Sequence, residues 1–129
     1  MSYKVEFSAH FTITYDDLPE DQQELIDDFV FHFRRNGLNG YKGKFGPTDN
    51  VPEQDPDRVH KIWYANRHKL WHAHIGHPYW VRSHPLAKYE TSDYVVHFQR
   101  LTPEYIALVE YGHHNPMAMP EKKSLFKHY

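Results

Sequence analysis

The sequence predicts an α+β fold: an N-terminal strand and helix pack on one face of a small antiparallel sheet, followed by a short C-terminal tail. Three observations predict it. A helical pattern occupies residues 17–36, three apolar strand-like runs lie within residues 69–111, and stretches rich in glycine and proline separate the two regions. We therefore expect a single domain over residues 1–129, with one face of its sheet covered by the helix and the other open.

The composition fits one globular domain. The chain has 129 residues, of which 40% are hydrophobic and 16% aromatic, enough for a modest core. It contains no cysteine, which excludes disulfide bonds and thiolate chemistry. No run reaches the roughly 20 apolar residues of a membrane span, and the first residues lack a signal-peptide pattern. We expect a cytoplasmic protein that does not associate with membranes.

Two elements are expected before residue 38. Residues 4–15 alternate between apolar and polar side chains, which predicts a strand with a break near His10. The following helix begins at Asp17, which caps it, and has Pro19 in its first turn. It ends at Asn36-Gly37. Its core-facing stripe consists of Leu18, Leu25, Ile26, Phe29, Val30 and Phe33.

The middle of the chain is less regular. Glycines and prolines recur over residues 38–56 and predict a solvated connection, in which Lys42 and Lys44 are not expected to cradle phosphate. Residues 57–67 fit either a short helix or a strand, and we expect an extended segment that leads into the sheet.

Three strands are expected next, at residues 69–76, 93–100 and 105–111. A long excursion that contains two prolines separates the first two, and a short turn separates the second from the third. Residues 120–129 are expected to form a short basic helix or tail.

Alternation along the first two strands divides their side chains between two faces. His72, His74 and His97 fall on the same face, which we expect to be exposed. The opposite face carries the side chains expected in the core: Trp71, Ala73, Ile75, Tyr94, Val96 and Phe98. The third strand is apolar on both sides, which predicts a central or covered strand.

Charge is distributed unevenly. Residues 1–60 hold 12 acidic and 6 basic side chains, whereas residues 61–129 hold 5 acidic and 9 basic ones, together with 9 of the 12 histidines. The second half is therefore expected to meet an anion. Histidine exchanges protons near neutral pH and suits acid–base chemistry, but His72, His74 and His97 also match a zinc-binding pattern, without a cysteine or a clear acidic partner. The residues themselves leave both chemistries open.

Three motifs resemble the RelE/ParE superfamily of bacterial toxins, and in particular its YafO-type branch. They are Leu-Trp-His-Ala-His-Ile-Gly at 70–76, Asp-Tyr-Val-Val-His-Phe at 93–98 and Ile-Ala-Leu-Val-Glu-Tyr-Gly-His-His at 106–114. The resemblance extends over nearly the whole chain, including the acidic helix that ends in Arg-Arg-Asn-Gly and the connector with Lys-Phe-Gly.

The resemblance implies a RelE-like microbial RNase fold and the toxin of a type II toxin–antitoxin system. Such a toxin is a ribosome-dependent mRNA endoribonuclease, or mRNA interferase, which a cognate antitoxin neutralises in a hetero-oligomer. It implies cleavage without metal or other cofactor. A base takes the proton of the 2′-hydroxyl, cations stabilise the phosphorane, and an acid protonates the leaving 5′-oxygen to give a 2′,3′-cyclic phosphate.

The resemblance also implies which residues act. The implied catalytic residues are His72, His74, His97, His113, His128 and Tyr129, and the implied RNA-binding residues are Lys69, Arg82, Arg100, His114 and Lys127. Many relatives carry lysine or arginine where this chain has His72, His74 and His113, so fewer permanent cations are available here. Because His113 and His114 are adjacent at a strand end, their side chains point in different directions and at most one is expected to act.

Two other functions are open from the sequence. The chain is also compatible with a catalytically inactive or gyrase-targeting binding protein of the RelE/ParE fold. Proteins of the ParE kind lack the catalytic residues, so the histidine-rich face argues against that alternative. The other alternative is a His-ligated metalloprotein, which would contain stoichiometric zinc, iron or copper.

Overall fold

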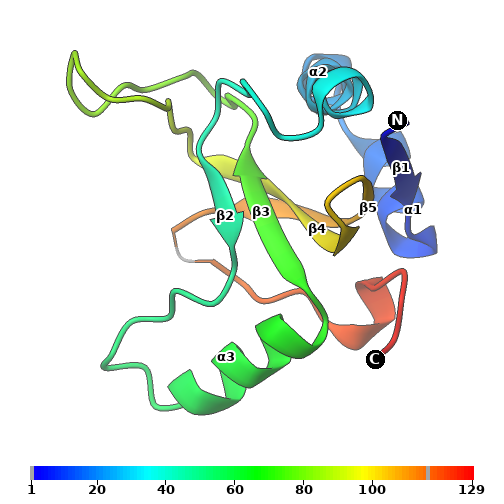
Figure 1. The fold of residues 1–129 in the computed structure, drawn as a ribbon, viewed down its shortest axis with the longest axis vertical. Helices are drawn as coiled ribbons and strands as arrows, with labels where there is room; N and C mark the ends of the chain where they lie inside the picture. The colour runs from blue at the N-terminus through cyan, green and yellow to red at the C-terminus, as the bar shows by residue number, and fades with distance from the viewer. Residues whose placement is uncertain (1, 116) are drawn as a thin grey trace.

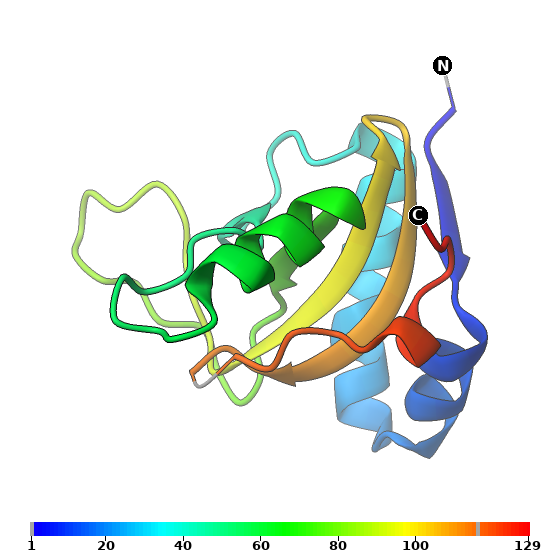
Figure 2. The ribbon, with the colours of Figure 1, turned by 90° about the horizontal axis from the view of Figure 1, so that it is seen from below.

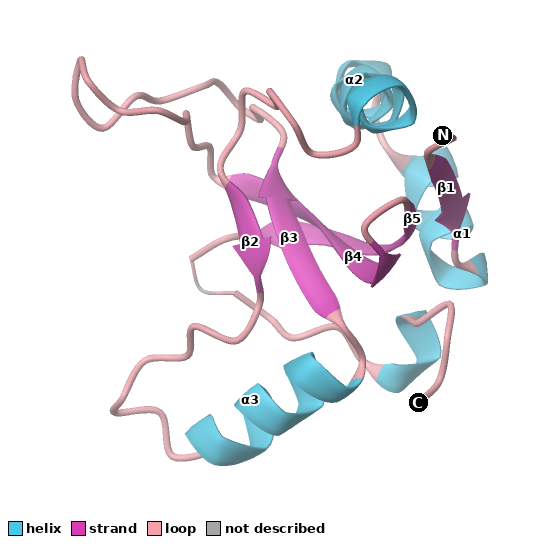
Figure 3. Ribbon diagram, in the orientation of Figure 1, coloured by secondary structure: helices cyan, strands magenta, loops and turns pink. Residues whose placement is uncertain are grey.

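The computed structural model describes residues 2–115 and 117–129, in which five strands form one sheet flanked by three α-helices (Figures 1 and 3). The fold is therefore α+β, as predicted. No helix in the described part of the chain has the length and apolarity to cross a membrane. In chain order the elements are β1 (Lys4–Phe7), α1 (Ala9–Asp17), α2 (Glu20–Asn36), β2 (Phe45–Pro47), α3 (Arg58–Arg67), β3 (Leu70–His74), β4 (Tyr94–Thr102), β5 (Tyr105–His113) and the 3-10 helix η1 (Lys122–Ser124).

The sheet is mixed, with strand order β1-β5-β4-β3-β2. The three predicted strands, β3, β4 and β5, pair antiparallel, and β2 adds to the free edge of β3. β1 pairs in parallel with β5, so that Val5 lies opposite Ile106. The expectation of a purely antiparallel sheet with the first strand on its face is therefore wrong. β1 instead occupies an edge, where it satisfies backbone groups of β5.

The predicted strand over residues 4–15 is wrong beyond Phe7, where a helix begins. Ser8 caps α1: its Oγ accepts a hydrogen bond from the Phe11 amide at 3.1 Å. The hydroxyls of Thr12 and Thr14 donate to backbone carbonyls one turn earlier. Alternation over this segment is therefore compatible with a helix, because the polar threonines bond along the helix axis instead of facing across a sheet.

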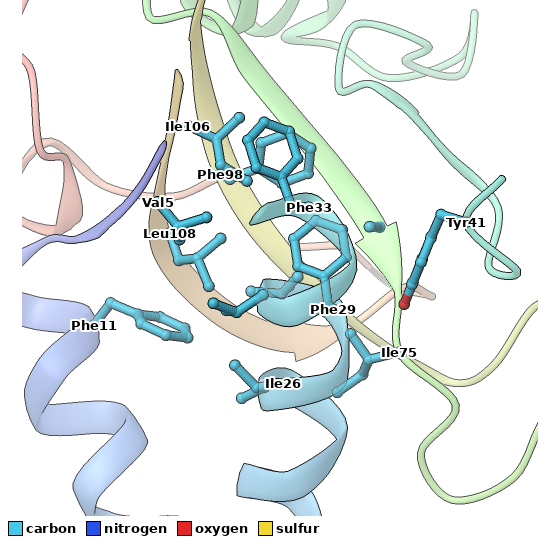
Figure 4. Close-up of a cluster of buried hydrophobic side chains, with 13 residues drawn as sticks. Val5, Phe11, Ile26, Phe29, Phe33, Tyr41, Ile75, Phe98, Ile106 and Leu108 are labelled. Carbon is cyan, nitrogen blue, oxygen red and sulfur yellow. The ribbon is translucent and has the colours of Figure 1, made fainter. Parts of the chain in front are cut away.

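α2 supplies most of the helical side of the core. It begins at Glu20 with Pro19 as N-cap, so the predicted cap at Asp17 is wrong, while the predicted end at Gly37 is confirmed by a positive φ of 63°. Figure 4 shows Ile26, Phe29 and Phe33 directed toward the sheet, where Phe98 and Ile106 meet them. Each large side chain buried in this way stabilises the fold by roughly 1.5–3 kcal/mol.

The segment expected to be extended, residues 57–67, is helical instead. α3 lies across the face of the sheet opposite α2 (Figure 2). Its Ala65 packs with Leu70, Val109 and Leu125 in a second apolar cluster. This burial selects the helix, because the local pattern of apolar residues fits either structure.

The sheet face predicted to be open is therefore covered in part. It carries Leu70 and Val109 beneath α3, together with the histidines of β3 and β4. His74 and His97 are only 2% and 1% exposed, so the expectation that they face solvent is wrong. The apolar side chains beneath α3 also explain why β5 is apolar on both faces.

A single glutamine holds the last segment on this face. The Gln99 Nε2 donates to the carbonyls of His68 and Lys127 at 3.1 and 2.7 Å, and its Oε1 accepts from the amides of Phe126 and Lys127 at 2.8 and 3.0 Å. The buried amide thereby uses all four of its hydrogen-bonding positions. The predicted short helix or tail is realised as η1 and an extended end docked on β4.

The glutamine contacts predict that Gln99→Ala releases the end of the chain. We expect its free energy of unfolding to fall by about 2–3 kcal/mol, because four buried hydrogen bonds lose their partner. Urea unfolding measures that loss, and hydrogen exchange at the Phe126 and Lys127 amides reports the release. Gln54→Ala, in an exposed loop, is the matched control and should change stability by less than about 0.5 kcal/mol. Unchanged protection of the two amides would contradict the assignment.

Candidate functional site

Four imidazoles lie close together on the sheet face that carries α3. His72 and His74 belong to β3, His97 belongs to β4, and His114 directly follows β5. The ring centroids of His74 and His114 are 4.6 Å apart, and those of His72 and His114 are 5.5 Å apart. The His72 centroid lies 6.2 Å from that of His97 and 6.3 Å from that of His74. We call these four side chains the histidine cluster.

Strand pairing assembles the cluster. In the antiparallel ladder of β3 and β4, His72 lies opposite His97, and the two-residue period puts His74 on the same face. His114 is brought in from the end of β5, where its amide donates to the Asp93 carbonyl at 2.7 Å. The predicted convergence of His72, His74 and His97 is therefore confirmed, and His114 joins them.

Hydrogen bonds orient two of the rings. The His72 Nδ1 lies 3.0 Å from the Thr48 hydroxyl. The His74 Nδ1 lies 2.8 Å from the Ser92 carbonyl oxygen and 3.1 Å from the Ser92 amide nitrogen. Because Nδ1 is engaged in both rings, Nε2 is the nitrogen left for other partners. The His97 Nδ1 is buried and makes no hydrogen bond within the described residues.

The cluster is neutral at pH 7. Burial, together with smaller contributions from the neighbouring imidazoles of His97, His114 and His74, lowers the pKa of His72 to about 3. Burial likewise lowers the pKa of His74 and of His97 to about 4, although the Ser92 backbone partly opposes this at His74. The pKa of His114 is lowered by burial and by the ammonium group of Lys44. The neutral rings can accept hydrogen bonds and protons, and their lowered pKa values make His72, His74 and His97 weaker bases than an ordinary imidazole.

A pocket of about 520 Å³ adjoins the cluster. His74 and His114 line it, and so does Lys44, which supplies a permanent positive charge. The side chains of Asp93 and Asn115 add a carboxylate and an amide. The pocket therefore combines three imidazole rings, those of His74, His113 and His114, with a cation and hydrogen-bonding groups, an arrangement that fits an anionic substrate with polar parts.

Lys44 is the main residue that sequence reasoning missed, since it was expected in a solvated loop. Its carbonyl accepts a hydrogen bond from the His74 amide at 2.9 Å, which places it beside β3. Gly43 permits this approach: a Cβ there would lie 2.4 Å from the His74 carbonyl oxygen and 2.8 Å from Trp80. Gly43, directly before Lys44, was the signal in the sequence for a close approach of the backbone to another segment. The sequence does not show which strand residues 38–56 approach.

The predicted site residues fall into separate groups. His113 lines the same pocket as His74, with its ring 4.2 Å from that of Tyr94, so both adjacent histidines border it. Arg82 follows Val81, another pocket residue, on the loop after β3. Arg100 lies on the opposite sheet face, where its guanidinium stacks 4.4 Å from the Trp71 ring centroid.

The remaining predicted residues, Lys69, Lys127, His128 and Tyr129, lie at the other end of the covered face. Gln99, which holds Lys127, pairs with Leu70 at the start of β3, whereas His74 ends that strand. Four residues of strand correspond to ~13 Å. The Lys69 ammonium lies 5.0 Å from the Tyr129 ring centroid, and Arg67 donates to the Tyr129 backbone oxygen. The last residues thus form a basic group separate from the histidine cluster.

Within residues 2–115 and 117–129, no three or more histidine, aspartate or glutamate side chains are arranged to hold a metal ion. The pocket holds a close imidazole pair, His74 and His114, beside the ammonium group of Lys44.

No family model, curated protein or solved structure matches the chain.

The lowered pKa values predict a loss of stability in acid. Because His72, His74 and His97 have folded-state pKa values below the ordinary 6.5, the unfolded chain binds more protons below that pH. Stability is therefore full above about pH 6.5 and falls as the pH decreases toward 4, by up to about 1.4 kcal/mol per pH unit for each group.

Replacing one ring tests this linkage. In His97→Gln, the slope of the free energy of unfolding against pH should decrease by up to about 1.4 kcal/mol per unit between pH 4 and 6. Urea titrations at several pH values measure the slope, whatever the variant's absolute stability. His84→Asn, at an exposed loop position, should retain the wild-type slope. An unchanged slope in His97→Gln would refute the assignment of a suppressed protonation to His97.

Proposed function

We propose that this protein is an endoribonuclease that cleaves RNA without a metal, as the toxin of a toxin–antitoxin system resembling the RelE/YafO type. In this proposal the cut phosphodiester binds in the pocket beside the histidine cluster. The observation that carries it is the pairing of His74 and His114, neutral at pH 7 and 4.6 Å apart at their centroids, on a pocket shared with Lys44. Attack by a 2′-hydroxyl requires a base, an acid and a nearby cation.

The orientation of its ring assigns the role of base to His74. When Nδ1 carries the ring hydrogen and donates it to the Ser92 carbonyl, Nε2 is left unprotonated and takes the proton of the 2′-hydroxyl. The 2′-oxygen then bonds to phosphorus while the bond from phosphorus to the 5′-oxygen breaks. Lys44 stabilises the negative charge that accumulates on the phosphoryl oxygens in this step.

His114 is the better acid, since it is half-buried at the pocket instead of enclosed by the sheet. A bound phosphodiester is negatively charged and favours the imidazolium form, which raises the pKa of His114 from its lowered value in the free protein. The protonated ring gives its proton to the 5′-oxygen. The products are a 2′,3′-cyclic phosphate and a 5′-hydroxyl, and the ring protons return to their starting positions through solvent.

The proposed partners follow from the same resemblance. They are the ribosome with its bound mRNA and a cognate antitoxin that forms a hetero-oligomer with this chain. The α+β architecture is compatible with a RelE-like fold. The three motifs that support it lie on or at the ends of β3, β4 and β5, and they contain all four residues of the histidine cluster. The parallel edge strand β1 and the cover provided by α3 are added to the three strands that contain these motifs.

Cleavage of mRNA in a translation reaction tests the proposal. We expect His74→Asn, His114→Asn and Lys44→Met each to reduce the rate about 10²-fold or more, because each removes one group of the proton-transfer site. Mapping the cut ends should find 2′,3′-cyclic phosphates, and a chelator specific for transition metals should leave the cleavage unchanged.

Matched variants at exposed positions serve as controls. His60→Asn and Lys123→Met should cleave at the wild-type rate. Deletion of His128 and Tyr129 examines the other group of predicted residues and should leave most of the activity. If that deletion abolishes cleavage while His74→Asn retains it, the site lies at the chain's end. If the wild-type protein cleaves no RNA but inhibits gyrase, the endoribonuclease proposal is wrong.

A further inference from the structure

The loop between β3 and β4 projects from the body of the molecule in both ribbon views (Figures 1 and 2). We call its residues 77–91 the arm. Its base is fixed to the pocket: the amides of Val81 and Thr91 bond to each other's carbonyls at 2.7 and 2.8 Å, and both residues line the pocket. The arm is therefore an extension of the pocket wall and not a detached loop.

Two further contacts hold the arm beside Lys44. The Lys44 amide donates to the Glu90 carbonyl at 2.8 Å, and the Glu90 amide donates to the Lys42 carbonyl at 3.1 Å. The Trp80 ring fits against Gly76, where an added Cβ would lie 2.5 Å from it. Whatever binds along the arm is consequently led toward the cation of the pocket.

The outer surface of the arm combines exposed apolar and basic side chains. Tyr79 is 67% exposed and Leu86 is 90% exposed, which is unusual for such large side chains. Arg82 and Lys88 are also exposed, and the Lys88 ammonium lies 5.6 Å from the centroid of the neighbouring Tyr89 ring. Aromatic rings interleaved with cations are typical of surfaces on which unpaired bases stack and phosphates are neutralised.

The charge of the arm differs from that of the helical side. Glu90 is the arm's one acidic residue, and its carboxylate lies within 3.4 Å of the Lys42 ammonium and 4.0 Å of the Arg82 guanidinium. The exposed surface of α1 and of the first half of α2, in contrast, is acidic through Asp16, Asp17, Glu20, Asp21, Glu24 and Asp28, whereas the last turn of α2 carries Arg34 and Arg35. A polyanion is therefore repelled by this acidic surface and attracted to the arm.

We propose that the arm is a docking surface for single-stranded RNA next to the cleaved bond. Tyr79 stacks on an unpaired base, while Lys42, Arg82 and Lys88 neutralise the phosphates of the same strand. A duplex is excluded from this mode because its base faces are already stacked and cannot reach an aromatic side chain. This inference rests on the proposed function for its substrate. It assigns to the arm the preference for single-stranded over double-stranded RNA.

Fluorescence anisotropy of a labelled single-stranded RNA tests the arm, with His114→Asn as the background in every protein to prevent cleavage. Tyr79→Ala should weaken binding about 10-fold, within the range for loss of one stacked base. The pair Arg82→Gln and Lys88→Gln should lower the slope of log affinity against log salt by about 1.4, the sum for two contacts with a single strand. The same RNA annealed to its complement should bind at least 10-fold more weakly than the single strand.

Controls are matched by residue type and exposure. Phe31→Ala removes an aromatic side chain exposed on α2, and the pair Lys122→Gln and Lys123→Gln removes two exposed charges near the chain's end. Both should bind RNA within about 2-fold of the background protein. Equal losses in controls and arm variants, wild-type binding by the arm variants, or equal affinity for the duplex would each overturn the inference.

The experiments distinguish a failure of the arm inference from a failure of the proposed function. If the protein cleaves RNA but the arm variants bind like the background, the arm inference is wrong and the proposed function stands. If RNA binding depends on the arm but the wild-type protein leaves RNA uncut, the arm inference stands and the proposed function is wrong.

Discussion

The antiparallel pairing of β3 with β4 is the constraint on which the rest of the structure depends. Its register sets His72 opposite His97 and Leu70 opposite Gln99. The same register turns Trp71 and Phe98 toward α2, so that one ladder defines both sides of the sheet. Because side chains alternate strictly, a slip by one residue would bury the histidines beneath α2 and expose the core.

Burial and charge act together on the covered face. The imidazoles are enclosed by strands and by connecting segments, and in this environment the neutral ring is favoured over the imidazolium. Lys44 adds a permanent charge at the edge of the cluster, where it lines the pocket together with His74 and His114. Burial and the charge of Lys44 both lower the pKa of His114. The protein thereby keeps neutral rings and a cation in the same place.

The covered face has two halves that are physically separate. Toward the end of β3 it carries the histidine cluster and the arm, and toward the start of β3 it carries α3 and the last residues, held by Gln99. The fixed end of the chain excludes solvent from the apolar cluster under α3. Packing thus accounts for the position of the last residues. The pocket lies apart from this closed half of the face.

Local patterns were sufficient for part of the structure. The period of two along residues 70–74 and 94–98 predicts which side chains share a face, and it correctly groups His72, His74 and His97. The helical stripe in α2 and its end at Gly37 are similarly local, since both follow from the spacing of apolar residues and from backbone freedom. Alternation alone was misleading over residues 8–15, where Ser8 offers a helix cap that competes with the strand.

The sequence by itself therefore determined the α+β class, the central strands and the shared face of three histidines, because these depend on neighbours a few residues apart. Tertiary structure decided that α3 is helical, that the histidine face is covered, and that Lys44 and His114 border one pocket. It also separated Tyr129 from that pocket. These features depend on contacts between segments distant in the chain, whose free energies appear in no local pattern.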